Sequence, residues 1–187
     1  MPFRRKLKRG PQVILPKDAA LILAYSGIAP GSRVVDAGAG SGFLATFLGT
    51  YLRPGKVYTY ENDERFLQVV KDNIAACGLE DVVTLKHADV TKGIKEKNVD
   101  LVTLDLKDAR KALKHARKAL VEGGMVVMYS PTIEHLMGVI KELKKEKFSE
   151  LKTVENIVRE WKTDLTTRPE TMGLMHTGFL TFAKKIE

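Results

Sequence analysis

One glycine-rich turn and three separate acidic residues are the strongest candidates for chemistry in this chain of 187 residues. The turn is Asp36-Ala37-Gly38-Ala39-Gly40-Ser41-Gly42, and the acids are Glu61, Asp89 and Asp105. Glycine has no Cβ and tolerates positive φ, so a turn of this kind lets the backbone approach a ligand closely. Each acid ends or follows a short apolar run that reads as a strand. We therefore expect all four groups at the carboxyl edge of one parallel sheet, where such sheets bind ligands.

The spacing around the turn favours a nucleoside that lacks a pyrophosphate. The dinucleotide fingerprint has Gly or Ala three residues after its second glycine, and Phe43 occupies that position here, which disfavours a nicotinamide cofactor. Glu61 closes the next strand about 20 residues on, where a carboxylate can accept hydrogen bonds from both ribose hydroxyls. S-adenosylmethionine fits this combination. The alternative for Glu61 is a solvated strand end.

The other two acids have a functional and a structural interpretation each. Asp89 follows the third expected strand and can accept a hydrogen bond from the adenine amino group of a cofactor; alternatively, it is a turn or cap residue. Asp105 follows the fourth expected strand, in the position that faces both cofactor and substrate. We expect Asp105 to be the catalytic group, with helix capping as the competing interpretation.

Other catalytic classes find little support in the sequence. The four histidines are scattered without metal-ligand spacing, so no metal is expected. They are His87, His115, His135 and His176. Ser41 and Ser130 lack the Gly-x-Ser-x-Gly elbow of acyl-transfer nucleophiles.

Strands and helices that position these residues alternate along the chain. Strands are expected at 33–37, 56–61, 82–86, 99–105 and 125–129, and helices at 18–26, 43–48, 63–77, 109–120 and 132–147. Such alternation predicts an α/β fold with a doubly wound, mostly parallel, Rossmann-like sheet and helices on both faces. Residues 151–161 and 176–183 read as a C-terminal antiparallel strand pair, joined by a loop that includes residues 168–173.

The amino-acid composition indicates the cellular location of the protein and the kinds of partner that it can bind. The chain has 31 Lys and Arg against 23 Asp and Glu, a formal net charge of +8, which favours polyanions such as nucleic acid, although solubility alone would also account for it. Its single cysteine, Cys77, excludes an internal disulfide framework and indicates an intracellular, cytoplasmic location. No apolar stretch approaches the roughly 20 residues that cross a bilayer, so no membrane partner is expected.

A helix that begins close to Asp105 carries many of the positive charges. Its basic residues are Arg110, Lys111, Lys114, Arg117 and Lys118. They are candidates for contacts with phosphate groups, and a solvated helix face is the alternative.

Several motifs resemble the tRNA (adenine-N1-)-methyltransferase family that modifies the T-loop, especially its archaeal members. They are the segment from Gln12 to Ala20, the glycine turn, Leu104-Asp105-Leu106, Tyr129-Ser130-Pro131, Arg168-Pro169 and the segment from His176 to Leu180. The resemblance extends over nearly the whole chain from about residue 9. The Pro-Lys-Asp of the first segment and the His-Thr-Gly of the last are more specific than the glycine turn.

This resemblance implies S-adenosylmethionine as donor, tRNA as substrate, methylation at N1 of adenine 58 with adenine 57 accepted by some archaeal members, and a homotetramer. Matched residue by residue, it implies that Asp105 holds the target adenine. The expected cofactor site consists of Gln12, Asp36, Gly38, Gly40, Ser41, Gly42, Glu61, Asp89 and Asp105.

The chain departs from the family pattern at three places. Family members carry a small additional N-terminal β domain that helps to bind tRNA, whereas we expect here only a basic N-terminal arm, residues 1–16, before a methyltransferase domain, residues 17–187. Leu15 stands where the family usually has Tyr, and Lys107 where it usually has Pro.

Two other functions remain as alternatives. One is a small-molecule methyltransferase similar to corrinoid-pathway enzymes, although those carry a glycine-rich segment where this chain has Asp105-Leu106-Lys107-Asp108. The other is a non-catalytic tRNA-binding homologue that keeps the fold.

Overall fold

The computed structural model describes residues 7–8, 10, 13–163, 166–173 and 176–186. The helices are α1 (Pro16–Ser26), α2 (Phe43–Leu52), α3 (Glu64–Cys77), α4 (Ala109–Ala119) and α5 (Ile133–Lys145). The strands are β1 (Arg33–Ala37), β2 (Lys56–Glu61), β3 (Val83–His87), β4 (Val99–Leu104), β5 (Leu120–Ser130), β6 (Phe148–Glu155), β7 (Trp161–Thr163), β8 (Thr167–Pro169) and β9 (Phe179–Lys185). Within these described ranges, no helix has the length and apolar character needed to cross a membrane.

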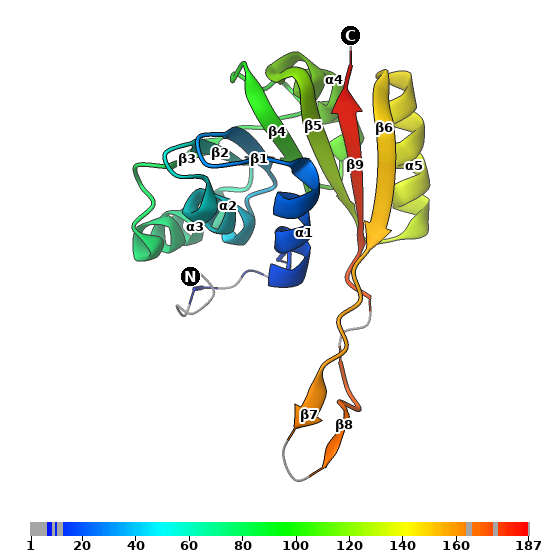
Figure 1. Cartoon of the computed structure of the whole chain (residues 1–187). Coiled ribbons are helices and arrows are strands. Elements are labelled where there is room, and N and C mark those ends of the chain that lie inside the picture. Colours follow the sequence, from blue (N-terminus) through cyan, green and yellow to red (C-terminus); the bar gives the residue numbers. More distant parts are fainter. Residues whose placement is uncertain (1–6, 9, 11–12, 164–165, 174–175, 187) are drawn as a thin grey trace.

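Seven strands form one sheet in the order β3-β2-β1-β4-β5-β9-β6 (Figure 1). Strands β1 to β5 pair in parallel, and β9 lies antiparallel between β5 and β6. The expected α/β, doubly wound and mostly parallel architecture with a C-terminal antiparallel pair is thereby confirmed. The chain order reverses between β1 and β4, which makes their carboxyl ends the switch point where such sheets bind ligands. The glycine turn follows β1, and Asp105 follows β4.

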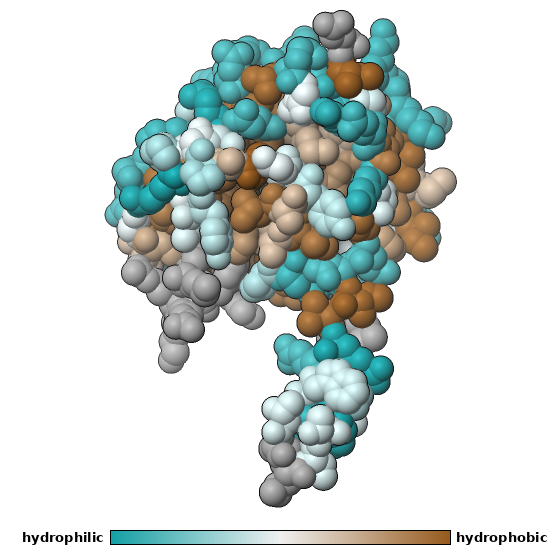
Figure 2. All heavy atoms as spheres, in the orientation of Figure 1, coloured by the Kyte–Doolittle hydropathy of each residue, from teal (hydrophilic) through white to brown (hydrophobic). Residues whose placement is uncertain are grey.

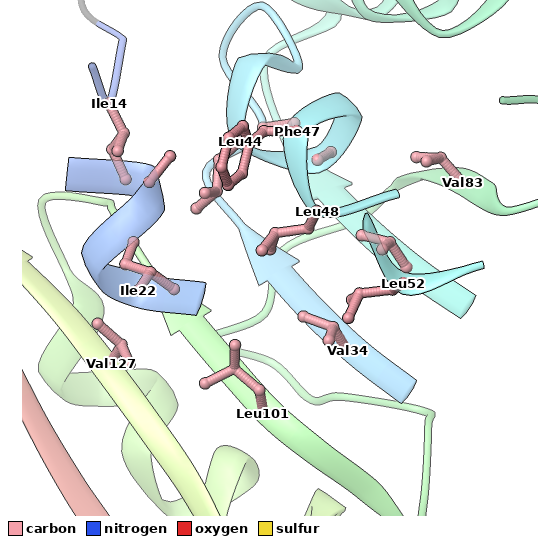
Figure 3. Packing of buried hydrophobic residues seen from close by; sticks show 14 of the residues in the cluster. Ile14, Ile22, Val34, Leu44, Phe47, Leu48, Leu52, Val83, Leu101 and Val127 are labelled. Atoms are coloured by element: carbon pink, nitrogen blue, oxygen red, sulfur yellow. The ribbon is translucent and has the colours of Figure 1, made fainter. Parts of the chain in front are cut away.

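Successive strand residues point to opposite faces of the sheet, and each face has its own helical cover. Val34 packs in a cluster with Ile22 of α1 and Leu48 of α2 (Figure 3), and Ile74 of α3 belongs to the same cluster. Its neighbour Val35 packs in a second cluster with residues of α4 and α5. The two apolar layers hold the sheet rigidly beneath the switch point.

Helix α1 begins earlier than the sequence predicts. The helix was expected to begin at residue 18, but it starts at Pro16, which is well suited to the first helical position because its missing N–H would have no intrahelical partner. Asp18 lies in the first turn, buried, and forms an ion pair. The Asp63 carboxylate, at the expected start of the third helix, accepts a hydrogen bond from the Arg65 N–H and caps α3.

The C-terminal region also differs from the expectation. Strand β5 begins at Leu120 rather than 125, with an irregular register before Leu101 of β4 pairs with Met125. The strand expected at 151–161 is β6, Phe148–Glu155, and Trp161 belongs to the separate antiparallel pair β7–β8. That pair projects away from the sheet (Figure 1), and Arg168 and Pro169, expected in a loop, lie in β8.

Candidate active site

A cavity of about 220 Å³ lies at the carboxyl ends of β1, β2 and β3. It is lined by Gly38, Tyr60, Glu61, Asn62, Ala88, Asp89, Val90, Thr91, Leu106, Lys107 and Asp108. A smaller hollow beside it is lined by Val13, Ile14, Asp36, Gly38, Ala39, Gly40, Phe43, Leu44 and Asp105. Glu61 and Asp89 therefore share one cavity, Asp105 lies in the neighbouring hollow, and Gly38 borders both.

Gly38 is where the two hollows meet, and only glycine fits there. Its φ is +90°, and a Cβ at this position would lie 2.0 Å from the carbonyl oxygen of Asp105. The N–H of Asp105 donates to the carbonyl of Ala37 at 2.9 Å, and the N–H of Gly38 donates to the carbonyl of Tyr60 at 3.1 Å. The turn is thus fixed to the strands on both sides of β1.

The Glu61 carboxylate is held by backbone donors. One oxygen accepts from the N–H of Gly40 at 2.8 Å, and the other accepts from Asn62 and Asp63 at 3.0 and 2.9 Å. A carboxylate offers about four acceptor positions, so three are taken and one is left. Because Glu61 is buried, the solvated strand end is not what the structure shows.

Asp89 combines both of its expected interpretations. One carboxylate oxygen accepts from the N–H and the hydroxyl of Thr91, at 2.8 and 2.7 Å, and so closes a tight turn. These hydrogen bonds lower the pKa of Asp89 below its usual value, so the group is ionised at neutral pH. Within the described part of the chain, its second oxygen accepts no hydrogen bond and is open to a ligand in the cavity.

The Asp36 carboxylate links neighbouring strands of the sheet through hydrogen bonds. It is buried beneath the turn and accepts hydrogen bonds of 2.8 Å from the hydroxyls of Thr59 on β2 and Thr103 on β4. Burial raises its pKa to about 6 against the opposing effect of these hydrogen bonds. Asp36 therefore joins β1 to both of its neighbours, and its expected contact with a cofactor remains a prediction.

Among the acids of the site, Asp105 is the one whose carboxylate accepts no hydrogen bond from the described residues. No side chain or N–H among the described residues donates to its carboxylate, and burial together with the nearby Asp36 raises its pKa to about 7. It also borders a second, apolar hollow with Ile14, Tyr129 and Leu180. Helix α4 begins only at Ala109 after Asp108, so Asp105 does not cap it.

The remaining expected cofactor residues lie around the turn or outside the described chain. Ser41 is buried, and its hydroxyl has no hydrogen-bond partner among the described residues. Gly42 has a φ of +77°, and a Cβ there would lie 3.2 Å from Val70 of α3, so it allows α2 and α3 to pack closely. Gln12 lies outside the described residues.

The sequence did not predict a polar network next to Asp105, which we name the Lys17 latch: Lys17, Asp18, Asn156 and Thr177. The Lys17 ammonium donates to the Asp18 carboxylate, the Asn156 carbonyl and the Thr177 hydroxyl at 2.8, 2.6 and 2.8 Å. The Thr177 hydroxyl donates to Asp18 at 3.0 Å. The Tyr129 hydroxyl donates to the Thr177 carbonyl, which links the latch to the apolar hollow that contains Asp105. The Pro-Lys-Asp and His-Thr-Gly motifs contain Lys17, Asp18 and Thr177, but neither their contact nor the part of Asn156 was predicted.

Comparisons with known proteins agree with this geometry. Residues 4–171 match the family described as tRNA methyltransferase complex GCD14 subunit. The chain is 34% identical, in an alignment 208 positions long, to the tRNA (adenine(57)-N(1)/adenine(58)-N(1))-methyltransferase TrmI of Methanocaldococcus jannaschii, and the alignment covers 96% of this chain and 74% of that protein.

Solved structures give the same picture. The tRNA (m1A58) methyltransferase TrmI from Aquifex aeolicus superposes with a TM-score of 0.91 at 26% identity, covering 100% of this chain and 75% of that chain. An S-adenosylmethionine-dependent O-methyltransferase from Thermotoga maritima superposes with a TM-score of 0.90 at 29% identity, covering 98% of this chain and 69% of that chain. The switch-point cavity, the acids around it and the match over most of the sequence lead to one conclusion: the chain belongs to the tRNA methyltransferase complex GCD14 subunit family.

Proposed function

We propose that this protein is an enzyme that transfers a methyl group from S-adenosylmethionine to N1 of an adenine in tRNA, at position 58 and also at position 57. The observation that carries the proposal is the Asp105 carboxylate, which lies beside the cavity of Glu61 and Asp89 and has no donor among the described residues. The named positions come from the archaeal relative, which is similar over 96% of this chain.

The residues of the cavity fit the proposed cofactor. Glu61 keeps one acceptor position for a ribose hydroxyl, and the free oxygen of Asp89 can accept from an adenine amino group. The glycine turn lets backbone approach the ligand, and the buried Ser41 hydroxyl offers a polar group beside it. When bound, S-adenosylmethionine supplies a methyl group that its positive sulfur activates for in-line displacement by a neutral base nitrogen.

Asp105 is the proposed catalytic residue. Its carboxylate accepts a hydrogen bond from the N6 amino group of the target adenine and so orients N1. Methylation at N1 leaves the base positively charged, and a nearby carboxylate stabilises that charge more in the transition state than in the ground state. Because the Asp105 carboxyl is largely withdrawn from solvent, this electrostatic effect is stronger than it would be in water.

The target adenine has to leave its paired or stacked position to reach Asp105. Enzymes that act on a base inside folded nucleic acid extrude it at a cost on the order of a few kcal/mol, which contacts elsewhere offset. Ile14, Tyr129 and Leu180 are packed beside Asp105 with no room for a base between them, so an adenine that reaches Asp105 has to displace or cover these apolar side chains.

The proposal extends to assembly, location and domain organisation. A homotetramer is supported by the projecting β7–β8 pair, where Ile157, Val158, Trp161 and Met172 are exposed. Hydrophobic surface gathers where the pair leaves the sheet (Figure 2), as expected of a contact between chains. We further propose a cytoplasmic location and a division into a basic arm, residues 1–16, and a methyltransferase domain, residues 17–187.

A direct assay tests the function. The protein is incubated with methyl-labelled S-adenosylmethionine and unmodified tRNA transcripts that carry adenine at positions 57 and 58, at only one of them, or at neither. Mass spectrometry of nuclease digests then locates the methyl group. We expect N1-methyladenine at position 58, and no label on the transcript that lacks both adenines. Label on a different base, or no label at all, would contradict the proposal.

The role of Asp105 is tested by Asp105→Asn. We expect kcat to fall by about 100-fold or more, because a neutral amide stabilises the developing charge poorly, while the Kd for the cofactor changes by less than about threefold. Asp81→Asn, which alters an exposed acid paired with Arg53, is the matched control and retains full activity. Equal losses in kcat and in cofactor affinity would make Asp105 a cofactor ligand only.

The two alternative functions give different results. A small-molecule methyltransferase would bind S-adenosylmethionine but leave every tRNA transcript unlabelled. A non-catalytic homologue would bind tRNA, and the melting temperature of the protein would not change when S-adenosylmethionine is added. The similarity to a tRNA enzyme over 96% of the chain favours the tRNA methyltransferase over the small-molecule enzyme.

A further inference from the structure

Five exposed lysines lie on α4 and on the loops that follow β3 and β4, and we name them the basic rim: Lys92, Lys107, Lys111, Lys114 and Lys118. Lys107 lines the cavity itself. Lys92 and Lys111 lie near enough to Asp89 for their charges to help lower the pKa of its carboxyl, after the larger effect of Thr91. The rim is therefore part of the same region as the site.

Three rim residues form a regular row. Lys111, Lys114 and Lys118 recur at intervals of three and four residues on α4, so they share one face of the helix. At 1.5 Å per residue, the row is about 10 Å long. The ring of His115 on the same helix lies 3.1 Å from the Thr91 carbonyl, which holds α4 against the loop that carries Lys92. The row and the loop thus form one continuous basic surface.

Most lysines of the basic rim form no ion pair with an acidic side chain among the described residues. In the described part of the chain, Lys111 is the rim member with an acidic partner, Asp108 at 3.2 Å, and both side chains are more than half exposed. An exposed pair of this kind contributes little and yields readily to a stronger anion. Glu142, the other acid beside this surface, is paired with Lys145.

The two arginines of α4 are engaged elsewhere. Arg117 donates to the carbonyls of Lys147 and Ile186 at 3.1 and 2.6 Å. Arg110 packs so closely against α5 that a Cβ on Gly138 would lie 2.8 Å from its guanidinium. The structure therefore divides the expected basic helix into packing arginines and free lysines.

We propose that the basic rim binds the phosphates of the tRNA strand that carries the target adenine. The inference rests on the proposed function and adds the surface on which the substrate lies. A strand of nucleic acid presents a phosphate about every 3.4 Å along its axis, so the row of α4 can meet about three. Phosphate contacts carry no sequence information, but they fix the register in which a base reaches the site.

The test variant is Lys111→Gln, Lys114→Gln and Lys118→Gln combined. The matched control is Lys71→Gln, Lys141→Gln and Lys144→Gln, which removes the same charge from exposed lysines outside the rim. Binding of an unmodified tRNA transcript is measured by fluorescence anisotropy over a series of salt concentrations. Methyl transfer to the same transcript is measured in parallel.

We expect the rim variant to bind tRNA about tenfold or more weakly than the control, and its plot of log affinity against log salt to be shallower by about two to three. Its kcat at saturating tRNA stays within about twofold of the control. An affinity and a salt slope equal to those of the control would overturn the proposal. So would displacement of tRNA by polyglutamate at equal charge concentration, because the rim would then be a site for acidic proteins. If binding depends on the rim but no methyl group is transferred, the proposed function fails and the rim stands.

Discussion

At neutral pH, a carboxyl group whose pKa is near 7 is present in both its protonated and its ionised form. Asp105 is such a group because it is buried and receives no hydrogen bond from the described residues. Burial disfavours its charge, and the nearby Asp36 disfavours it further. A target base that donates from its amino group favours the charged form and would lower the pKa again. Without a bound base, the ionised Asp105 carboxylate therefore destabilises the folded protein.

That cost predicts a pH-dependent stability. The folded pKa of Asp105, about 7, lies above its ordinary value of 3.8, so its stabilising contribution is present below about pH 4 and is lost as the pH rises through 7. We expect Asp105→Asn to remove this loss and to raise the free energy of unfolding at pH 8 by about 1–3 kcal/mol. Urea denaturation at pH 5 and pH 8 measures it, with Asp81→Asn as control. A variant less stable than wild type at pH 8 would show that Asp105 is not destabilising.

Among the elements, the glycine turn joins β1 to β4 by direct backbone contact, and this predicts a large effect of one methyl group. Gly38→Ala would place a Cβ 2.0 Å from the Asp105 carbonyl and force a positive φ on alanine, so we expect it to cost about 2–4 kcal/mol. Gly27→Ala is the matched control, because Gly27 also has a positive φ but open space around its missing Cβ, and it should cost about 1 kcal/mol. Equal losses in thermal denaturation would mean that only the backbone angle matters.

The Lys17 latch connects α1 to the segments on either side of the β7–β8 pair, and it is a buried charged network. Lys17→Met would leave the buried Asp18 carboxylate without its cation, and we expect a loss of about 3–5 kcal/mol in chemical denaturation. Adding Asp18→Asn should recover part of that loss. Lys145→Met, which breaks an exposed pair with Glu142, should cost less than about 0.5 kcal/mol. Purely additive effects of the first two substitutions would mean that the two residues are not coupled.

The elements themselves were largely predictable, because alternating apolar runs and glycine stops are local signals. Strands β1 and β2 have the expected bounds, and Gly78 ends α3 as predicted. Contacts between distant segments left no such signal. The two threonines that donate hydrogen bonds to Asp36 lie on the neighbouring strands. The start of β5 at Leu120 depends on its pairing with β4. The stretch that reads as one strand is divided between β6 and the β7–β8 pair.

The same holds for the candidate site. That Glu61 and Asp89 share a cavity followed from the order of strands, and the structure shows it. The separation of Asp105 into an adjoining hollow, with Gly38 between them, required the packing of the Asp105 carbonyl on the turn. Tyr129 was named only as part of a motif, and its position next to Asp105 comes from the parallel pairing of β5 with β4, in which Met128 lies opposite Leu104.

For the whole molecule, the projecting β7–β8 pair predicts self-association. Val158 and Trp161 are about half exposed, and isolated two-stranded hairpins are rarely stable without a partner. In sedimentation experiments, we expect particles of about four times the mass of one chain, and smaller species for the combination of Val158→Lys and Trp161→Lys. The exposed Tyr51→Lys on α2 serves as control. A wild-type protein that sediments as a single chain at micromolar concentration would contradict the homotetramer.

Strand β9 lies between β5 and β6, although β6 precedes it in the chain. A ribosome emits about 5–20 residues per second, so β6 emerges on the order of a second or more before the strand that will hold it. During that interval, β5 is the exposed edge of the sheet and β6 is unpaired, so both can pair with a strand of another nascent chain. The length of the segment between Glu155 and Phe179 therefore sets how long these strands of a nascent chain stay unpaired and open to aggregation.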